Sequence, residues 1–320
     1  SMLFSAGLGI GLLFYGVAEP IYHFNDNPFV DNIDTIAAAR SAMGITFYHY
    51  GIQAWSIYAT VGLALAFFTF NLKLPLTIRS IFYPLLGDKI YGRWGDLIDV
   101  ISVIATVVGL ATSLGLGAQQ VNAGIEYLFG IEYSREAQMI IIVIITALAT
   151  LSLLAGLDKG IRRLSEINMG LAMVLLVFVL AIGPTAFLMD SFVQNLGYYI
   201  DNFFKIGLWT ESFVGVKDDS NWQNVWTVFY YAWWIAWSPF VGIFIARVSK
   251  GRTIPAFLLG QVLVPSISKC PSPLASSIQQ MADESVIDGD VEGALLASAF
   301  ASLAFLCRCV YAFPSPSTLP

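Results

Sequence analysis

Charge is scarce in this chain of 320 residues. Charged side chains make up 12% of it and hydrophobic residues 57%, whereas soluble domains contain roughly 25% charged residues. The mean hydropathy is +0.72. With 16 basic and 22 acidic residues, the formal net charge is −6, so no basic face for nucleic acid is expected. The composition predicts an all-α integral membrane protein whose main partner is the lipid bilayer.

Residues for metal binding and catalysis are also few. The chain has two histidines and three cysteines, and the cysteines are Cys270, Cys307 and Cys309. One residue separates the last two and no histidine is near, which is not the spacing of a zinc site. The hydrophobic segments contain no HExxH motif, nucleophile–base pair or Cys/His ligand set. The sequence therefore predicts no enzyme, no metal site and no cofactor, and a charged or carbonyl-rich channel motif is equally absent.

Long uncharged runs dominate the chain instead. A helix needs about 17–25 predominantly apolar residues to cross a bilayer. The runs predict spans over 1–18, 41–72, 97–126, 137–157, 167–189, 222–246 and 253–266. In the segment 191–207, apolar residues recur at helical spacing with polar residues opposite, which predicts a helix on the membrane interface or, alternatively, a gating lid.

Basic residues are unevenly distributed between these spans. The islands at 73–93, 159–163 and 247–252 hold ten of the sixteen lysine and arginine residues, and the alternate islands are rich in acids. This alternation follows the positive-inside rule. The three basic islands are therefore expected in the cytoplasm, and the protein is expected to be multi-pass in the cell (inner) membrane.

The two ends differ from the middle. The chain begins at Ser1 inside a hydrophobic segment, without a charged leader or cleavage-site pattern, and we interpret this as an incomplete N-terminus. After Pro265 the segment 269–273 interrupts the seventh span. Residues 1–265 are thus expected to form the membrane core, and 266–320 a divergent tail that is misframed or disordered.

Two spans carry residues that weaken a helix. The first contains Gly7, Gly9 and Gly11 and leads to Glu19-Pro20, and the span over 222–246 contains Ser238-Pro239. Close packing through small residues is one explanation of the glycines. Paired broken helices that bind a substrate at mid-membrane, as in transporters with inverted repeats, explain both spans. The two segments are five spans apart and oppositely oriented, which favours the second interpretation.

Aromatic residues gather near these breaks. Trp233, Trp234 and Trp237 lie within 222–246, and a second set in 41–72 consists of Tyr50, Trp55 and Tyr58. Aromatic faces attract a quaternary ammonium group by about 0.5–2 kcal/mol per contact when dry. Free N–H groups at the glycine break would bind an anionic end of the same substrate. The alternative for the second set is an interfacial aromatic belt, and His49 is expected to be a hydrogen-bonded structural residue or, alternatively, a proton relay.

The segment 226–242, WTVFYYAWWIAWSPFVG, followed by ARVSKGR at 246–252, resembles the signature of the betaine/carnitine/choline transporter family. The segments 7–11, 49–58 and 106–117 support this resemblance, which covers residues 1 to about 265. It implies two inverted five-helix repeats, of which this chain contains the first and the start of the second, and commonly a homotrimer.

The resemblance also implies a function. It points to secondary active transport of glycine betaine, choline or carnitine by symport with Na⁺ or H⁺, with a role in osmoregulation. The alternative is a membrane sensor or binding protein that does not translocate its ligand, or an inactive transporter fragment.

Individual residues receive roles from the same resemblance. The implied substrate-binding residues are Trp233, Trp234, Trp237, Trp55, Tyr58, Tyr50, Gly9 and Gly11. The implied ion-binding residues are Ser5, Leu8, Thr106 and Phe240. Tyr50 and Tyr231 stand where tryptophan is common, which leaves the substrate open, and Leu110 stands where a second threonine would help to bind sodium.

Overall fold

The computed structural model of the chain describes residues 15–32, 35–154, 183–213 and 221–263, with Ser266 and scattered positions between 166 and 181. Within these ranges the regular elements are helices, as the composition predicts. The first glycines, nearly all of the divergent tail and part of the expected span over 167–189 lie outside the described residues.

Three helices in the described ranges are long and apolar enough to cross a membrane, judged by length and composition. They cover Ile36–Asn71, Arg93–Phe129 and Asn224–Val248. Each overlaps a span predicted from the sequence, namely 41–72, 97–126 and 222–246. The helix α7 (Arg135–Leu154) overlaps the predicted span 137–157, and a shorter apolar helix over Ile254–Leu263 falls within 253–266.

The chain divides into two compact units. Unit 1 comprises residues 1–46, 113–200 and 271–320, and unit 2 comprises 47–112 and 201–270. Among the described residues of unit 1, the helices are α2 (Gly16–Asn25), the first part of α3 (Ile36–Tyr50), the last part of α6 (Arg93–Phe129), α7 and α9 (Thr185–Asp201). In its core, Ala118 and Val121 of α6 pack with Ile141 and Ile145 of α7.

The helix α2 differs from the prediction that the first span ends at residue 18. It continues through Glu19-Pro20 to Asn25. Glu19 and His23 are fully buried, and the His23 Nε2 lies 3.0 Å from the Glu19 Oε1 one helical turn away. The charge pattern alone predicts that Glu19 and His23 lie outside the spans, in one of the acidic islands. The hydrogen bond between them explains how both polar groups can be buried.

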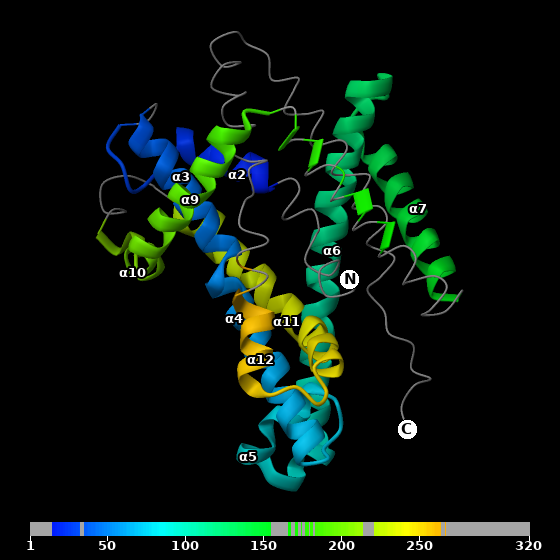
Figure 1. Cartoon of the computed structure of the whole chain (residues 1–320). Helices are drawn as coiled ribbons and strands as arrows, with labels where there is room; N and C mark the ends of the chain where they lie inside the picture. The colour runs from blue at the N-terminus through cyan, green and yellow to red at the C-terminus, as the bar shows by residue number, and fades with distance from the viewer. Residues whose placement is uncertain are drawn as a thin grey trace. The chain divides into compact units, whose positions relative to one another are not determined.

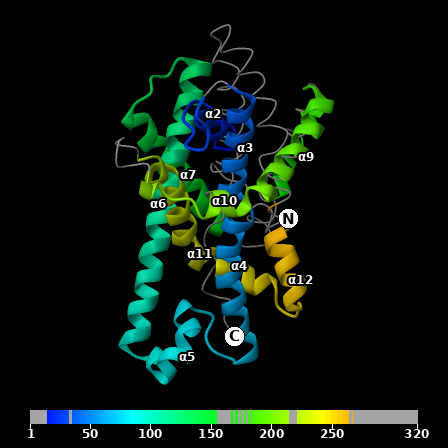
Figure 2. The ribbon, with the colours of Figure 1, turned by 90° about the vertical axis from the view of Figure 1, so that its left-hand side faces the viewer.

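Two long helices form the centre of unit 2. They are α4 (Ile52–Ala66) and α11 (Phe229–Val248), which lie side by side in Figures 1 and 2. Glycine permits this close approach. A Cβ atom on Gly242 would lie 2.5 Å from the Val61 Cγ1, and one on Gly62 would lie 2.8 Å from the Ile245 Cγ2. Small residues at the contact therefore allow the two backbones to pack closely.

Shorter elements surround this pair. The π-helical segment η2 (Phe67–Asn71) continues α4, and the π-helical segment η7 (Asn224–Val228) precedes α11. The helix α12 (Ile254–Leu258) and the π-helical segment η8 (Leu259–Leu263) pack against α4. Between α4 and α6 the chain forms η3 (Ile78–Phe82), α5 (Tyr83–Leu86) and η4 (Gly87–Tyr91). The basic island at 73–93 is thus a folded connection.

The helix expected over 191–207 is divided in two. The first part belongs to α9, which begins earlier, at Thr185, and ends at Asp201. The second part is α10 (Phe203–Gly207), and Asn202 separates them with a non-helical backbone (φ −98°, ψ 9°). The prediction of one continuous helix was therefore wrong, because asparagine favours helix ends over helix interiors.

Candidate functional site

A helix break lies beside the aromatic residues, but on α4 rather than on α11. The helix α3 ends at Tyr50 and α4 begins at Ile52, and Gly51 between them is non-helical (φ −86°, ψ −145°). The backbone N–H of Trp55 donates to the carbonyl of Gly51 at 3.2 Å, so Gly51 supplies an acceptor at the start of α4. The predicted continuous span 41–72 is therefore interrupted between Tyr50 and Trp55.

The predicted break at Ser238-Pro239 is wrong. The helix α11 runs through Pro239 to Val248. Proline has no N–H to donate to the carbonyl of Ile235, four residues earlier. The Ser238 hydroxyl donates to that carbonyl instead, at 2.8 Å. The serine thus satisfies the group that proline leaves unpaired, and no free helix ends are created at this position.

Six aromatic side chains of unit 2 form what we call the aromatic cluster: Tyr50, Trp55, Tyr58, Tyr230, Trp233 and Trp234. The rings of Trp233 and Trp234 are stacked, with centroids 5.4 Å apart and an interplanar angle of 5°. Tyr50 and Tyr58 meet Trp234 nearly at right angles, at 5.7 Å and 72° and at 6.2 Å and 79°. Trp234 is therefore the ring at which residues from both sides of the helix break meet α11.

Several pairs of rings in this cluster are close to perpendicular. Trp55 and Tyr58 are 5.6 Å apart at 68°, so they too are close to perpendicular. Tyr50, Tyr58 and Trp233 are buried, whereas Trp55 and Trp234 are partly accessible. The rings thus face into unit 2. Edge-to-face contacts at these distances are the arrangement that aromatic rings prefer when they pack together, and a ring face that stays accessible can attract a cation.

Hydrogen bonds fix the central ring. The indole Nε1 of Trp234 donates to the main-chain carbonyl of His49 at 3.0 Å. This carbonyl lies in the last turn of α3, where carbonyl groups accept no hydrogen bond from an N–H group of the same helix. The Tyr50 hydroxyl also donates to the Tyr230 hydroxyl at 3.0 Å. The end of α3 therefore positions the cluster through both its backbone and its last side chain.

His49 is hydrogen-bonded, as the structural interpretation expected. It is fully buried, its Nε2 lies 3.0 Å from the Thr227 Oγ1, and its ring stacks on Tyr230 at 4.7 Å and 21°. Tyr230 is fully buried as well, and it is absent from the site residues predicted from the sequence. Its spacing of three and four residues from Trp233 and Trp234 places it on the same helix face and could have identified it.

Trp237 has different neighbours. Its ring contacts Phe240 at 5.9 Å and 78°. It also packs closely on α6, where a Cβ atom added to Gly109 would lie 2.8 Å from the Trp237 Cδ1. Thr106, one turn earlier on α6, donates its hydroxyl to the carbonyl of Ser102 at 2.8 Å. Two predicted site residues, Trp237 and Phe240, are thus in contact with each other.

Four other predicted site residues fall outside the described ranges. They are Gly9 and Gly11, expected to bind the substrate, and Ser5 and Leu8, expected to bind an ion. Their roles stay predictions.

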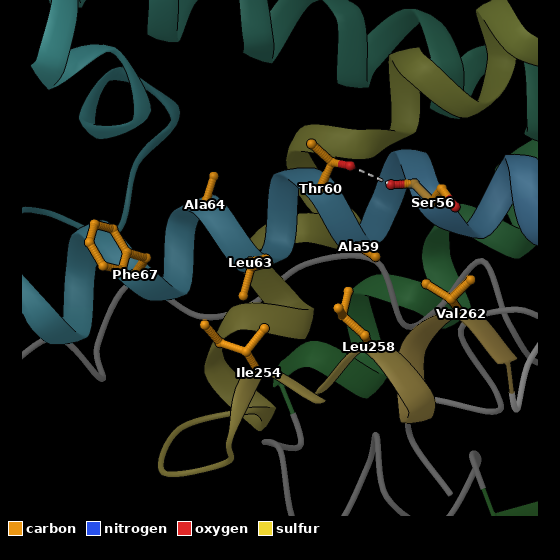
Figure 3. Close-up of a pocket in the computed structure, with 9 residues that line it drawn as sticks. All are labelled: Ser56, Ala59, Thr60, Leu63, Ala64, Phe67, Ile254, Leu258 and Val262. Atoms are coloured by element: carbon orange, nitrogen blue, oxygen red, sulfur yellow. Dashed lines mark hydrogen bonds between the residues drawn. The ribbon is translucent and has the colours of Figure 1, made fainter. Parts of the chain in front are cut away.

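A groove on another face of α4 is distinct from the cluster (Figure 3). The residues that line it are Ser56, Ala59, Thr60, Leu63, Ala64, Phe67, Ile254, Leu258 and Val262. The Ser56 hydroxyl donates to the carbonyl of Ile52 at 2.6 Å, and the Thr60 hydroxyl donates to the carbonyl of Ser56 at 2.7 Å. The two hydroxyls of this lining are thus engaged by their own helix, and the groove offers an apolar surface rather than a site for a charged ligand.

Comparisons with known proteins agree with the residue pattern. The family model described as "BCCT, betaine/carnitine/choline family transporter" matches residues 1–272. A glycine betaine/proline/choline transporter of Vibrio parahaemolyticus is 48% identical over 282 residues, which cover 83% of this chain and 50% of that protein. A glycine betaine transporter of Bacillus subtilis is 50% identical over 270 residues, covering 83% of this chain and 52% of the relative.

A third relative is a longer protein. The high-affinity choline transport protein of Escherichia coli is 46% identical over 265 residues, covering 83% of this chain and 39% of the relative. The chain therefore spans about half the length, or less, of the curated relatives that it matches. With the family model matching most of its residues, the chain belongs to the betaine/carnitine/choline transporter family.

Proposed function

We propose that this chain forms part of a secondary active transporter for quaternary-ammonium compounds of the glycine betaine, choline or carnitine type. In this proposal the aromatic cluster binds the ammonium group. The observation that carries it is the arrangement of Tyr50, Tyr58 and Trp233 around Trp234, at centroid distances between 5.4 and 6.2 Å.

The chemistry shared by the named substrates of the relatives supports this assignment. Glycine betaine carries a carboxylate and choline a hydroxyl, but both carry a trimethylammonium group. A site for either compound must therefore recognise a permanent cation that cannot donate a hydrogen bond. Aromatic faces meet this requirement at about 0.5–2 kcal/mol per contact, so three faces would contribute roughly 2–6 kcal/mol.

The lack of acidic residues in the two helices α4 and α11 is consistent with the same role. The sequences of α4 and α11 contain neither aspartate nor glutamate. A carboxylate within a membrane is costly when its partner is absent. A site built from rings alone avoids an unpaired charge each time the substrate leaves.

The wider architecture belongs to the proposal as well. Residues 1–18 and 222–246 would be the opening helices of two inverted repeats, since the charge pattern gives them opposite orientations. Because α11 is continuous at Pro239, the backbone N–H groups for an anionic end would come from the glycines of the first segment rather than from α11. A Na⁺ or H⁺ gradient would drive symport, and replacement of external sodium during an uptake measurement distinguishes the two ions.

The experiment is a paired measurement of binding and uptake. The chain is reconstituted in vesicles, radiolabelled glycine betaine uptake is recorded, and binding is followed by tryptophan fluorescence. We expect Trp234→Ala to weaken binding by roughly 2–30-fold for each aromatic ring that no longer touches the ligand. Trp209→Phe is the matched control, because Trp209 pairs with Trp222 outside the cluster. Equal binding by Trp234→Ala and the control would refute the site, and binding without uptake would refute transport by this chain.

A further inference from the structure

The connection between α4 and α6 is fixed to the start of α6 by one arginine. The Arg79 Nε donates to the Asp99 Oδ2 at 2.6 Å, and the Arg79 Nη2 donates to the Asp96 Oδ1 at 3.0 Å. The Arg79 Nη1 donates to the carbonyl of Ile90 at 3.2 Å, and the Arg79 backbone N–H donates to the Asp99 Oδ1 at 3.0 Å. Four hydrogen bonds therefore hold η3 and η4 on the first turns of α6.

Close packing reinforces this frame. A Cβ atom on Gly95 would overlap the carbonyl oxygen of Ile90, so only glycine fits there. The hydrogen bond with Asp99 raises the pKa of Arg79 above its usual value. The guanidinium thus stays charged and compensates the two carboxylates that it contacts.

Large apolar side chains project from this rigid frame. Leu85 is 81% exposed, Tyr91 58% and Trp94 61%. Burying such side chains would be favourable at about 25 cal/mol for each Å² of apolar surface. A fixed segment that exposes three of them close together in the sequence is therefore expected to contact another apolar phase or partner.

The position of Trp94 indicates which phase this is. Trp94 is the first residue of an exposed apolar stripe along α6, spaced three and four residues apart, that continues with Leu97, Ile101, Ile104 and Val108. The span predicted from the sequence, 97–126, begins three residues after Trp94, or about 4.5 Å along the helix. The headgroup layer on each side of a bilayer is about 5–8 Å thick. Trp94 therefore falls at the level of the headgroups, where tryptophan and tyrosine are enriched.

Basic side chains accompany the apolar ones. Lys89 and Arg93 lie between Leu85 and Trp94 in the sequence and are exposed. Basic residues beside a membrane surface are attracted to anionic lipids, by about 1 kcal/mol each. The segment thus combines apolar side chains for the acyl boundary with positive charges for anionic headgroups.

We propose that residues 82–94 form an interfacial anchor, in which Leu85, Tyr91 and Trp94 enter the headgroup layer and Lys89 and Arg93 bind anionic lipid headgroups. The anchor fixes the level of α6 in the bilayer. Arg79 is the positioning residue, because it holds the segment on α6 and neutralises Asp96 and Asp99. The exposed Asp88 offsets part of the charge of Lys89 and Arg93.

The test measures where the anchor lies in a bilayer. The full chain, with its three cysteines replaced by serine, receives Leu85→Cys and an environment-sensitive fluorophore, and is reconstituted in vesicles of phosphatidylcholine with or without phosphatidylglycerol. Asp31→Cys, at an exposed polar position, is the control. We expect the probe at position 85 to be quenched by spin labels on lipid headgroups and to be protected from aqueous iodide, and the control to show the reverse.

Two results would overturn the anchor. Iodide quenching at position 85 equal to that of the control would place the segment in water, and protection from both quenchers would place it against protein. A second probe at Tyr91→Cys guards against a local effect of the first. In the double variant Lys89→Gln, Arg93→Gln, the ratio of lipid-bound to free segment should fall by about fivefold per residue in phosphatidylglycerol vesicles, whereas an unchanged ratio would contradict the role of charge.

Discussion

The contact between α4 and α11 gives a prediction that can be worked out atom by atom. In Gly242→Ala the new methyl group would lie 2.5 Å from the Val61 Cγ1, 3.1 Å from the Val61 Cβ and 3.3 Å from the backbone nitrogen of Gly62. Val61 is β-branched and cannot easily rotate away in a helix. The helices must therefore separate by some tenths of an ångström or more.

Two opposing effects set the magnitude. Replacing glycine by alanine within a helix gains up to about 1 kcal/mol from helix propensity. Overpacking of a close contact costs about 1–3 kcal/mol. We therefore expect Gly242→Ala to lower the free energy of unfolding by about 1–2 kcal/mol, since the cost of overpacking exceeds the gain in propensity.

The assay is a double-mutant cycle on unfolding in detergent micelles, followed by tryptophan fluorescence. Val61→Ala removes the clashing atom, so Gly242→Ala should be almost neutral in that background, with a coupling energy of about 1–3 kcal/mol. The control is Gly115→Ala on α6, where an added Cβ meets no atom within 4 Å, and it should be neutral or slightly stabilising. Additive effects of Gly242→Ala and Val61→Ala would refute the packing argument.

Two further predictions concern hydrogen bonds near the cluster. Ser238→Ala should lower the free energy of unfolding by about 1 kcal/mol or more, because the carbonyl of Ile235 would lose its donor opposite Pro239. Ser238→Thr keeps a hydroxyl and should restore the stability. Equal stability of the two variants in the same micelle assay would contradict this role of the hydroxyl. Tyr50→Phe keeps the ring and removes the hydroxyl that donates to the Tyr230 hydroxyl, so we expect a decrease of about 0.5–1.5 kcal/mol in stability. Choline affinity, measured by equilibrium dialysis, should change little, and a large decrease in affinity would show that the hydroxyl itself binds the ligand.

The sequence predicted the helical fold and that aromatic residues are concentrated in α4 and α11, but not the position of the break. Ser238-Pro239 is a strong helix-breaking signal by local rules, and the serine hydroxyl cancels it by donating to the carbonyl of Ile235. Gly51 is a single glycine within a long apolar run, which is a weak signal, yet it is there that the backbone leaves the helical region.

Contacts between distant segments were beyond local rules. The meeting of Tyr50 and Tyr58 with Trp234 joins residues about 180 positions apart, so no periodicity could reveal it. Trp237 shares a helix face with Trp233 in the sequence, but its close packing on Gly109 depends on where α6 lies. The identity of the aromatic residues could therefore be predicted, whereas their partners required the fold.

Comparison of choline with its uncharged isostere, in which a tert-butyl group replaces the trimethylammonium group, tests most directly whether the cluster recognises a cation. The two ligands have almost the same shape, so a difference in their affinity for the chain in lipid nanodiscs reports the charge. We predict that choline binds at least about tenfold more tightly, as expected for two or three cation–π contacts, and that Trp234→Leu removes most of this preference. Equal affinity for the two ligands, or a preference that survives Trp234→Leu, would contradict the account.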